Sequence, residues 1–208
     1  MPGSPAPDEG ADGRPTVVFF GTSLTAGLGL PSEDDTYVAH AAELARAAGV
    51  PIIPVNAGVS GETSAAGLRR IDWILQRDLD VLVLELGAND ALRGLGIDQL
   101  RENLLEIIRR TRTRHPEAEV VLLGMEAPTN LGERYTAAFR QVFADVAEEE
   151  DTFFVPFLLE GVAGVPELNQ SDRIHPTVEG HRRMAENLMP TLTTAIEAAY
   201  SRMESVPR

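Results

Sequence analysis

The amino-acid sequence predicts an α/β protein in which a mostly parallel sheet of about five strands lies between layers of helices. Two observations predict this three-layer, doubly wound, flavodoxin-like arrangement. Short apolar runs alternate with longer amphipathic segments, and the runs recur about 30–40 residues apart, as expected for βαβ units. Residues 81–86 (VLVLEL) read as a continuous apolar run, which is typical of a parallel strand buried on both faces.

The first half of the chain already shows this alternation. Residues 17–20 (VVFF) predict a buried strand, and the Gly-, Thr- and Ser-containing loop that follows can turn tightly. Residues 36–49 are alanine-rich with helical spacing and a terminal glycine, which predicts a helix. The next elements expected are a strand at residues 51–56, a flexible turn at residues 57–61 and a helix at residues 63–75.

The second half continues with the strand at residues 81–86 and a loop at residues 87–90. An amphipathic helix is predicted for residues 97–114 because His115 and Pro116 end the helical pattern. Further strands are expected at residues 120–125 and 152–156, further helices at residues 133–150 and 177 to about 203, and a polar loop at residues 171–176. Residues 157–168 are ambiguous and are compatible with a short helix interrupted by glycines.

Composition excludes several classes of function. The chain has 18 basic and 32 acidic residues, a formal net charge of −14, and every basic residue is arginine. Such an acidic surface repels phosphate backbones, so we expect no nucleic-acid partner. The absence of cysteine excludes disulfides, thiol nucleophiles and cysteine-ligated zinc, and the absence of lysine excludes a Ser–Lys dyad and a Schiff base. No His/Asp/Glu set has a metal spacing, and no cofactor is expected.

The length of 208 residues fits one domain, which we expect to span residues 15–208. Residues 1–14 consist mainly of Pro, Gly, Ala and acidic residues and predict a disordered leader without a signal-peptide core. No apolar run approaches the ~18–20 residues needed to cross a bilayer. As written the chain reads as cytoplasmic, and it would be exported if Met1 stands in place of a removed signal. The oligomeric state is left open.

Three residues have the chemistry of an acyl-transfer site. Ser23 follows the first predicted strand, where ligands bind in open α/β sheets, and a serine hydroxyl needs an adjacent base to become a nucleophile. His175 can be that base, and Asp172, three residues earlier, can orient its imidazole. The alternative is that the residues around Ser23 only cap a turn and that Asp172 caps the turn before an exposed histidine.

Two further residues follow the second and third strands and can stabilise an oxyanion. Gly61 offers a backbone N–H and Asn89 a side-chain amide, and both should emerge at the same sheet edge as Ser23. Gly87 to Asp90 could instead be a plain turn, and the segment around Gly58 and Gly61 a weak phosphate loop. The other histidines, His40, His115 and His181, are expected at the surface.

These blocks resemble the SGNH hydrolases of the GDSL type, a family named for a Ser, a Gly, an Asn and a His in separate blocks. The blocks here are Phe20-Gly21-Thr22-Ser23-Leu24, residues 56–63 (NAGVSGET), Gly87-Ala88-Asn89-Asp90 and Asp172-Arg173-Ile174-His175-Pro176, in the family's order. The sequence between the blocks is similar to that of the family branch with thioesterase I, lysophospholipase and arylesterase activities. The resemblance covers roughly residues 15–200 and implies the SGNH hydrolase fold.

By this resemblance Ser23 is the nucleophile, His175 the base and Asp172 its orienting residue, while Ser23 N–H, Gly61 N–H and the Asn89 side chain form the oxyanion hole. Residues 91–96 correspond to a mobile loop that covers the acyl chain, and Leu92 and Pro128 are candidate substrate-lining residues. One position departs from the family pattern, because Thr22 replaces the usual Asp of Gly-Asp-Ser-Leu. Hydrogen bonding behind Ser23 must therefore differ.

The function expected is a serine esterase that cleaves aryl or short-to-medium acyl esters through an acyl-enzyme, with thioesters and lysophospholipids as further substrates. Its partner is then a small-molecule ester. Two alternatives remain open: a carbohydrate acetyl esterase of the same fold, and a non-catalytic flavodoxin-like module that binds a ligand on its glycine-rich loops.

Overall fold

A computed structural model describes residues 13–205 and shows five parallel strands in one sheet, in the order β2-β1-β3-β4-β5. This is the strand order of flavodoxin-like folds, so the predicted fold class is confirmed. The strands are β1 (Thr16–Gly21), β2 (Ile53–Gly58), β3 (Val81–Glu85), β4 (Glu119–Leu123) and β5 (Phe153–Val155). Of the leader expected at residues 1–14, residues 1–12 lie outside the described residues.

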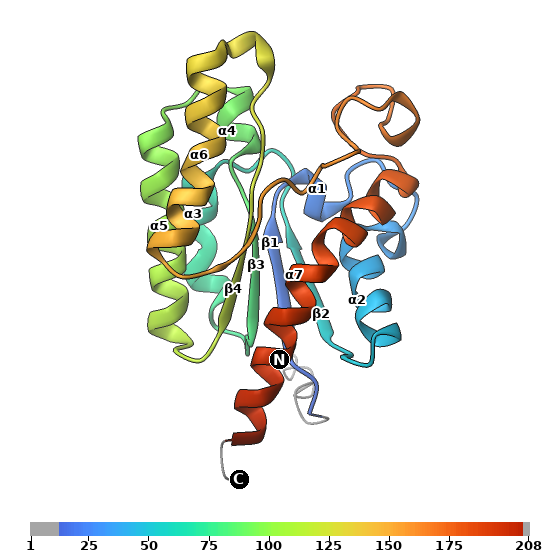
Figure 1. The fold of residues 1–208 in the computed structure, drawn as a ribbon, viewed down its shortest axis with the longest axis vertical. Helices are drawn as coiled ribbons and strands as arrows, with labels where there is room; N and C mark the ends of the chain where they lie inside the picture. Colours follow the sequence, from blue (N-terminus) through green and yellow to red (C-terminus); the bar gives the residue numbers. More distant parts are fainter. Residues whose placement is uncertain (1–12, 206–208) are drawn as a thin grey trace, which may run out of the picture.

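Helices cover both faces of the sheet (Figure 1). Helices α2 (Tyr37–Ala47) and α7 (Val178–Ser205) pack together on one face, and α3 (Ser64–Ile74), α5 (Ile97–Arg114) and α6 (Glu133–Glu149) cover the other. Each long helix was expected from its sequence pattern, with ends that differ by at most a few residues. Residues 13–205 also contain three short 3₁₀ turns: η2 (Glu33–Asp35), η3 (Thr129–Leu131) and η4 (Pro166–Leu168).

The hydrophobic core lies between the sheet and these helices. All side chains of the first predicted strand and of the β3 run Val81 to Leu84 are fully buried. Both faces of β1 and β3 are covered, which explains why their sequences are apolar without alternation. Among residues 13–205, no helix is both long and apolar enough to cross a bilayer.

Two predicted loops are helical. Ser23 begins the short helix α1 (Ser23–Ala26), and Asn89 lies in the first turn of α4 (Ala88–Leu92). Helices this short show no periodicity in the sequence, and the glycines beside them suggested loops. In contrast, residues 157–168 form turns that end in η4 rather than an interrupted helix. The two short helices follow β1 and β3, adjacent strands at the point where the strand order reverses, and this is where such sheets bind ligands.

Candidate active site

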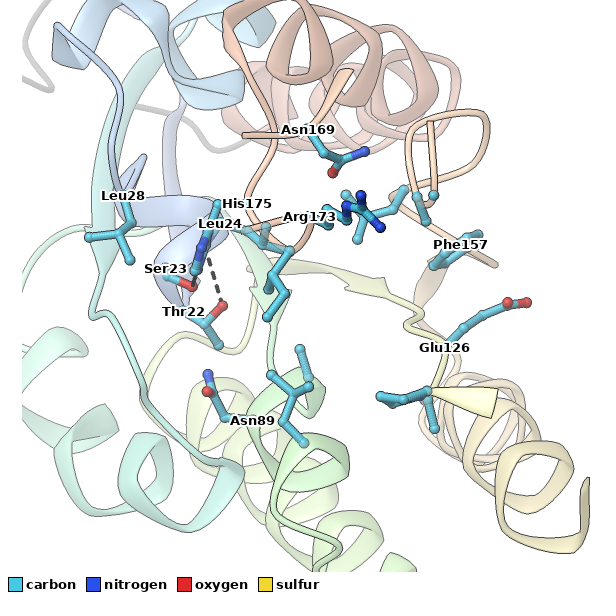
Figure 2. Close-up of a pocket in the computed structure, with 18 of the residues that line it drawn as sticks. Thr22, Ser23, Leu24, Leu28, Asn89, Glu126, Phe157, Asn169, Arg173 and His175 are labelled. Carbon is cyan, nitrogen blue, oxygen red and sulfur yellow. Dashed lines mark hydrogen bonds between the residues drawn. The ribbon is translucent and has the colours of Figure 1, made fainter. Parts of the chain in front are cut away.

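Ser23, His175 and Asp172 are joined by a chain of hydrogen bonds, although Ser23 and His175 are 152 positions apart in the sequence. His175 Nε2 lies 2.9 Å from Ser23 Oγ (Figure 2), and His175 Nδ1 lies 2.7 Å from Asp172 Oδ2. Because a carboxylate only accepts, Nδ1 carries the ring proton, and Nε2 is left to accept the hydrogen bond of the serine hydroxyl. The sequence prediction that these three side chains converge therefore agrees with the geometry.

Local structure fixes both ends of this chain of hydrogen bonds. Thr22 caps α1 by accepting from the N–H of Leu24, and Gly27 ends the helix in the left-handed conformation at φ 72°. At the other end, Asp172 Oδ1 accepts the N–H groups of Ile174 and His175 at 2.9 and 3.0 Å.

The hydrogen bond from His175, followed by those from the two backbone N–H groups, lowers the pKa of Asp172 below its usual range. Asp172 is thus ionised at any working pH. The turn cap that the sequence offered as an alternative exists, and the same carboxylate also holds the imidazole.

Gly61 and Asn89 lie on the wall of the same cavity as Ser23 and His175. Gly61 has φ +79°, a conformation that glycine adopts without strain, and its carbonyl accepts from Arg93 at 2.9 Å. Next to Asn89, the buried Asp90 accepts the N–H and the hydroxyl of Ser64, the first residue of α3. These bonds fix the segment that carries Gly61 against the one that carries Asn89.

The cavity is a cleft of about 790 Å³, a volume typical of small-molecule sites. Most of its lining is apolar, and Leu92 and Pro128 are part of it. Leu92 is 52% exposed, and Leu28 and Ile174 are also exposed where they line the cleft. Further apolar lining comes from Leu24, Ala127, Phe157, Leu159 and Ala163.

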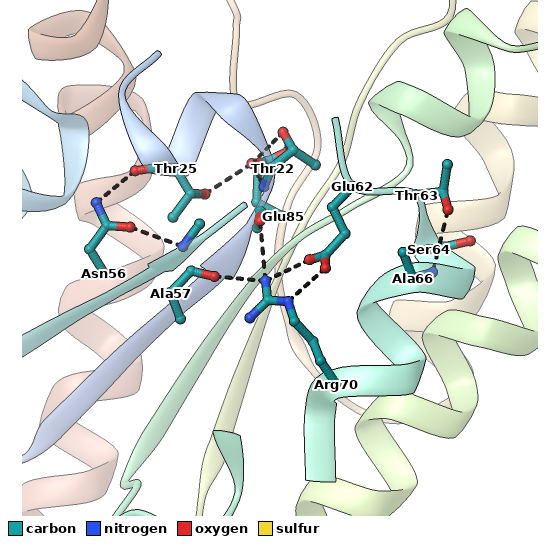
Figure 3. Close-up of polar contacts among 12 residues, drawn as sticks. Thr22, Thr25, Asn56, Ala57, Glu62, Thr63, Ser64, Ala66, Arg70 and Glu85 are labelled. Atoms are coloured by element: carbon teal, nitrogen blue, oxygen red, sulfur yellow. Dashed lines mark hydrogen bonds and ion pairs between the residues drawn. The ribbon is translucent and has the colours of Figure 1, made fainter. Parts of the chain in front are cut away.

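A fully buried carboxylate, Glu85, lies beneath the helix that carries Ser23 (Figure 3). It accepts from the Thr22 N–H at 2.7 Å, from the Thr22 hydroxyl at 3.0 Å and from the Thr25 hydroxyl at 2.9 Å. Because the Thr25 hydroxyl donates to Glu85, the hydroxyl of Tyr37, 2.8 Å from Thr25 Oγ1, must donate to Thr25. Burial raises the pKa of Glu85 to about 7 and also raises that of Tyr37.

Backbone packing around Glu85 explains the glycine that precedes Thr22. A Cβ on Gly21 would collide with the Thr25 hydroxyl and with the Glu85 carboxylate. Hydrogen bonding behind Ser23 was expected to change with Thr22, and Glu85 is the partner that Thr22 contacts.

A second buried carboxylate holds the segment after β2. Glu62, 6% exposed, receives two hydrogen bonds from Arg70, at 2.6 Å from Nε and 2.5 Å from Nη2 (Figure 3). The same guanidinium donates to the carbonyl of Ala57 at 2.7 Å and lies 4.0 Å above the ring of Phe20. Arg70 therefore links Ala57 and Glu62, which flank the segment that carries Gly61 (the Gly61 segment), to the end of β1.

The sequence interpretation missed Glu85, Arg70 and Glu62. A glutamate inside the run at residues 81–86 was a signal, because a buried carboxylate needs partners. The prediction that three histidines lie at the surface was wrong for His181. This residue is 1% exposed and accepts the Tyr37 N–H at Nδ1. The side chain of His40 is only 13% exposed, and His115 is partly buried with Nε2 at 3.0 Å from the Leu75 carbonyl.

A family model described as the GDSL-like lipase/acylhydrolase family matches residues 19–183. The chain belongs to this family. The GDSL-like chain is 42% identical over 178 residues to the esterase TesA of Pseudomonas aeruginosa, a match that covers 85% of this chain and 87% of that one. It is 32% identical over 178 residues to an arylesterase of Vibrio mimicus, with coverage of 82% and 84%.

A thioesterase 1/protease 1/lysophospholipase L1 of Escherichia coli is 36% identical over 133 residues, 64% of this chain and 63% of that one. A crystal structure of TesA has a TM-score of 0.82 at 40% identity and covers 86% of this chain and 99% of its own. The predicted SGNH family and enzyme class, a carboxylic ester hydrolase, are thereby confirmed for this GDSL-like chain. In its described residues, no group of three or more His, Asp or Glu side chains is arranged to hold a metal ion.

Proposed function

We propose that this chain hydrolyses aryl or short-to-medium acyl esters through an acyl-enzyme on Ser23, with thioesters and lysophospholipids as further substrates. The observation that carries the proposal is the chain of hydrogen bonds from Ser23 Oγ to His175 and on to Asp172, at the wall of an apolar cleft. The names of the relatives, esterase, arylesterase and thioesterase/lysophospholipase, support the same substrate classes.

In the first half-reaction, Ser23 Oγ attacks the ester carbonyl carbon while His175 Nε2 takes the hydroxyl proton. Asp172 holds the imidazole in the tautomer that can accept this proton and stabilises the imidazolium that forms. The tetrahedral intermediate then expels the alcohol or thiol, which leaves with the proton from His175. The acyl group remains bonded to Ser23.

In the second half-reaction, a water molecule attacks the acyl carbon and gives its proton to His175. Ser23 leaves with that proton, and the free acid departs. The negative oxygen of both tetrahedral intermediates would be stabilised by the N–H groups of Ser23 and Gly61 and by the Asn89 amide. Ser23 is the first residue of α1, and the first N–H groups of a helix have no acceptor within the helix.

The apolar lining of the cleft suits substrates whose acyl group is a hydrocarbon chain. Its wall carries leucines and aromatic or aliphatic neighbours, and Leu92 and Pro128 are the lining residues that we propose to contact the acyl chain. Burial of each methylene contributes about 0.8 kcal/mol, which favours short-to-medium chains over acetate.

The test compares wild type with Ser23→Ala on p-nitrophenyl butyrate, with Ser201→Ala on the exposed part of α7 as the control. We expect Ser23→Ala to lose activity by about a thousandfold or more with an unchanged melting temperature, and Ser201→Ala to behave as wild type. A fluorophosphonate probe should label Ser23 in the wild-type protein, as located by peptide mass mapping.

Full activity of Ser23→Ala, or labelling of another residue, would overturn the assignment of Ser23. Absence of both labelling and turnover in the wild-type protein would favour the ligand-binding module instead. A substrate panel addresses the remaining alternative: faster cleavage of acetylated sugars than of butyrate and octanoate esters would identify a carbohydrate acetyl esterase.

A further inference from the structure

Arg173 has an unusual backbone conformation for an arginine. Its φ is 60°, in the left-handed region that glycine and asparagine favour, and the only other non-glycine residue with positive φ in residues 13–205 is Asp151. The turn geometry itself is made by Asp172, whose carboxylate binds the following N–H groups. An arginine is therefore not needed for the turn and is strained in it, which directs attention to its side chain.

The side chain of Arg173 lines the cleft, on the part of the wall that Asn169 and Phe157 also line (Figure 2). It is exposed, and within residues 13–205 its guanidinium has neither a carboxylate nor a hydrogen-bonding partner. This is unlike Arg70 and Arg140, which are paired with Glu62 and Glu126. Arg173 also differs from Arg93, which lies near the same site and donates to the carbonyl of Gly61.

The charges around Arg173 leave its guanidinium available to a ligand. Glu126, the one carboxylate among the described lining residues, lies 2.8 Å from Arg140 in an ion pair. Asp172, the neighbour in sequence, is engaged by His175 and by two backbone N–H groups. A guanidinium stays charged at every working pH and binds the two oxygens of a carboxylate or phosphate at once.

We propose that Arg173 is a specificity-determining residue that binds an anionic group, a carboxylate or a phosphate, carried by the ester substrate. This inference rests on the proposed function, because it assigns a substrate class to the same cleft. The anionic group can belong to the acyl part, as in the half-ester of a dicarboxylic acid, or to the leaving alcohol, as in a phosphorylated glycerol ester. In both cases the apolar wall binds the hydrocarbon part and Arg173 the charge.

The experiment uses two matched substrate pairs. Mono-p-nitrophenyl succinate differs from p-nitrophenyl butyrate by a carboxylate in place of the terminal methyl group, and 1-decanoylglycerol 3-phosphate differs from 1-decanoylglycerol by the phosphate. For each pair the ratio of kcat/KM, anionic over neutral, is measured for wild type, Arg173→Gln and the charge-matched control Arg183→Gln. Arg183 lies on α7, is exposed and pairs with Glu186.

We expect the ratio for at least one pair to fall by about tenfold or more in Arg173→Gln and to stay at the wild-type value in Arg183→Gln. High salt should lower the wild-type ratio toward that of Arg173→Gln, because the cleft is open to solvent. The pair that responds identifies the source of the charge. Ratios that are equal in wild type and Arg173→Gln for both pairs would overturn the proposal.

A binding measurement separates this proposal from the proposed function. Octyl phosphate and octyl glucoside are titrated into the Ser23→Ala protein and into the Ser23→Ala, Arg173→Gln double variant. Loss of about tenfold or more in affinity for octyl phosphate alone would support the role of Arg173 even if no ester were cleaved. Equal affinity of both proteins for octyl phosphate would overturn that role even if Ser23 proved to be the nucleophile.

Discussion

Thr22 and Glu85 contact each other directly behind Ser23, with the Thr22 N–H 2.7 Å from one carboxylate oxygen and the Thr22 hydroxyl 3.0 Å from both. Thr22 precedes the proposed nucleophile, and Glu85 is the last residue of β3, the strand that leads to Asn89. The pair thus connects the segment that carries Ser23 with the segment that carries Asn89. It also places a carboxyl group with a raised pKa inside the fold.

Glu85→Gln should become more stable relative to wild type as the pH rises. The pKa of Glu85 is about 7 in the folded protein and near 4.5 when unfolded, so folding binds a proton between these values. This proton binding stabilises folded wild type. Its contribution to the free energy of unfolding is complete below pH 4.5 and is lost as the pH rises through 7, by up to about 3 kcal/mol. Urea unfolding of both proteins at several values between pH 5 and 8 measures the difference.

The comparison with the variant is necessary because His181 acts in the opposite direction. Burial lowers the pKa of His181 to about 4, so it favours unfolding as the pH falls from 6.5 toward 4. The two effects partly cancel in wild type, whereas the difference between wild type and Glu85→Gln contains only the Glu85 effect. A difference that does not change with pH would contradict a raised pKa at Glu85.

Arg70→Lys should lower kcat about tenfold with little change in KM. Lysine keeps the charge but cannot make the paired bonds to Glu62 together with the bond to the Ala57 carbonyl, so the Gly61 segment loses its fixed position. Arg70 is a positioning residue, and an effect on kcat separates this role from one in substrate binding. Arg69→Lys on the same helix is the control, because within residues 13–205 exposed Arg69 bonds only the Ala65 carbonyl. Equal kinetics of the two variants would refute the prediction.

Asp172→Asn should reduce kcat by about a hundredfold or more while the turn remains folded. The amide oxygen of asparagine can still accept the N–H groups of Ile174 and His175. Toward the imidazole, however, asparagine presents an N–H₂ donor, which favours the tautomer whose Nε2 carries the proton and cannot accept from Ser23. Steady-state kinetics and circular dichroism together test this, and wild-type kcat in the folded variant would exclude an orienting role for Asp172.

Arg173→Gly should stabilise the protein by about 0.5–1 kcal/mol. Relief of the left-handed strain is worth about 1–2 kcal/mol, and the greater freedom of glycine in the unfolded chain removes about 0.4–1 kcal/mol of that gain. Arg173→Ala removes the same charge but keeps the strain, so its free energy of unfolding should equal that of wild type. A stability of Arg173→Gly at or below that of Arg173→Ala would show that the turn is not strained.

Sequence reasoning predicted the elements whose signals are local and long. The helix at Ile97–Arg114 and the parallel sheet of alternating strands and helices followed from periodicity and from βαβ spacing. Ser23, Asn89 and His175 were recognised because their residue types and order match a family pattern. The prediction failed for features that depend on distant partners: the burial of His181 against Tyr37, 144 positions away, and the contacts of Glu85 with Thr22, 63 positions away. Single-sequence patterns carry no information on such pairings.

The turn from Asp172 to His175 divides its four residues between two tasks. Its first and last side chains bond to each other, whereas Arg173 and Ile174, between them, both line the cleft. Substrate preference can therefore diverge in this family through two adjacent codons, with the proton-transfer geometry left intact. A library randomised at residues 173 and 174 alone is a compact route to esterases with new selectivity.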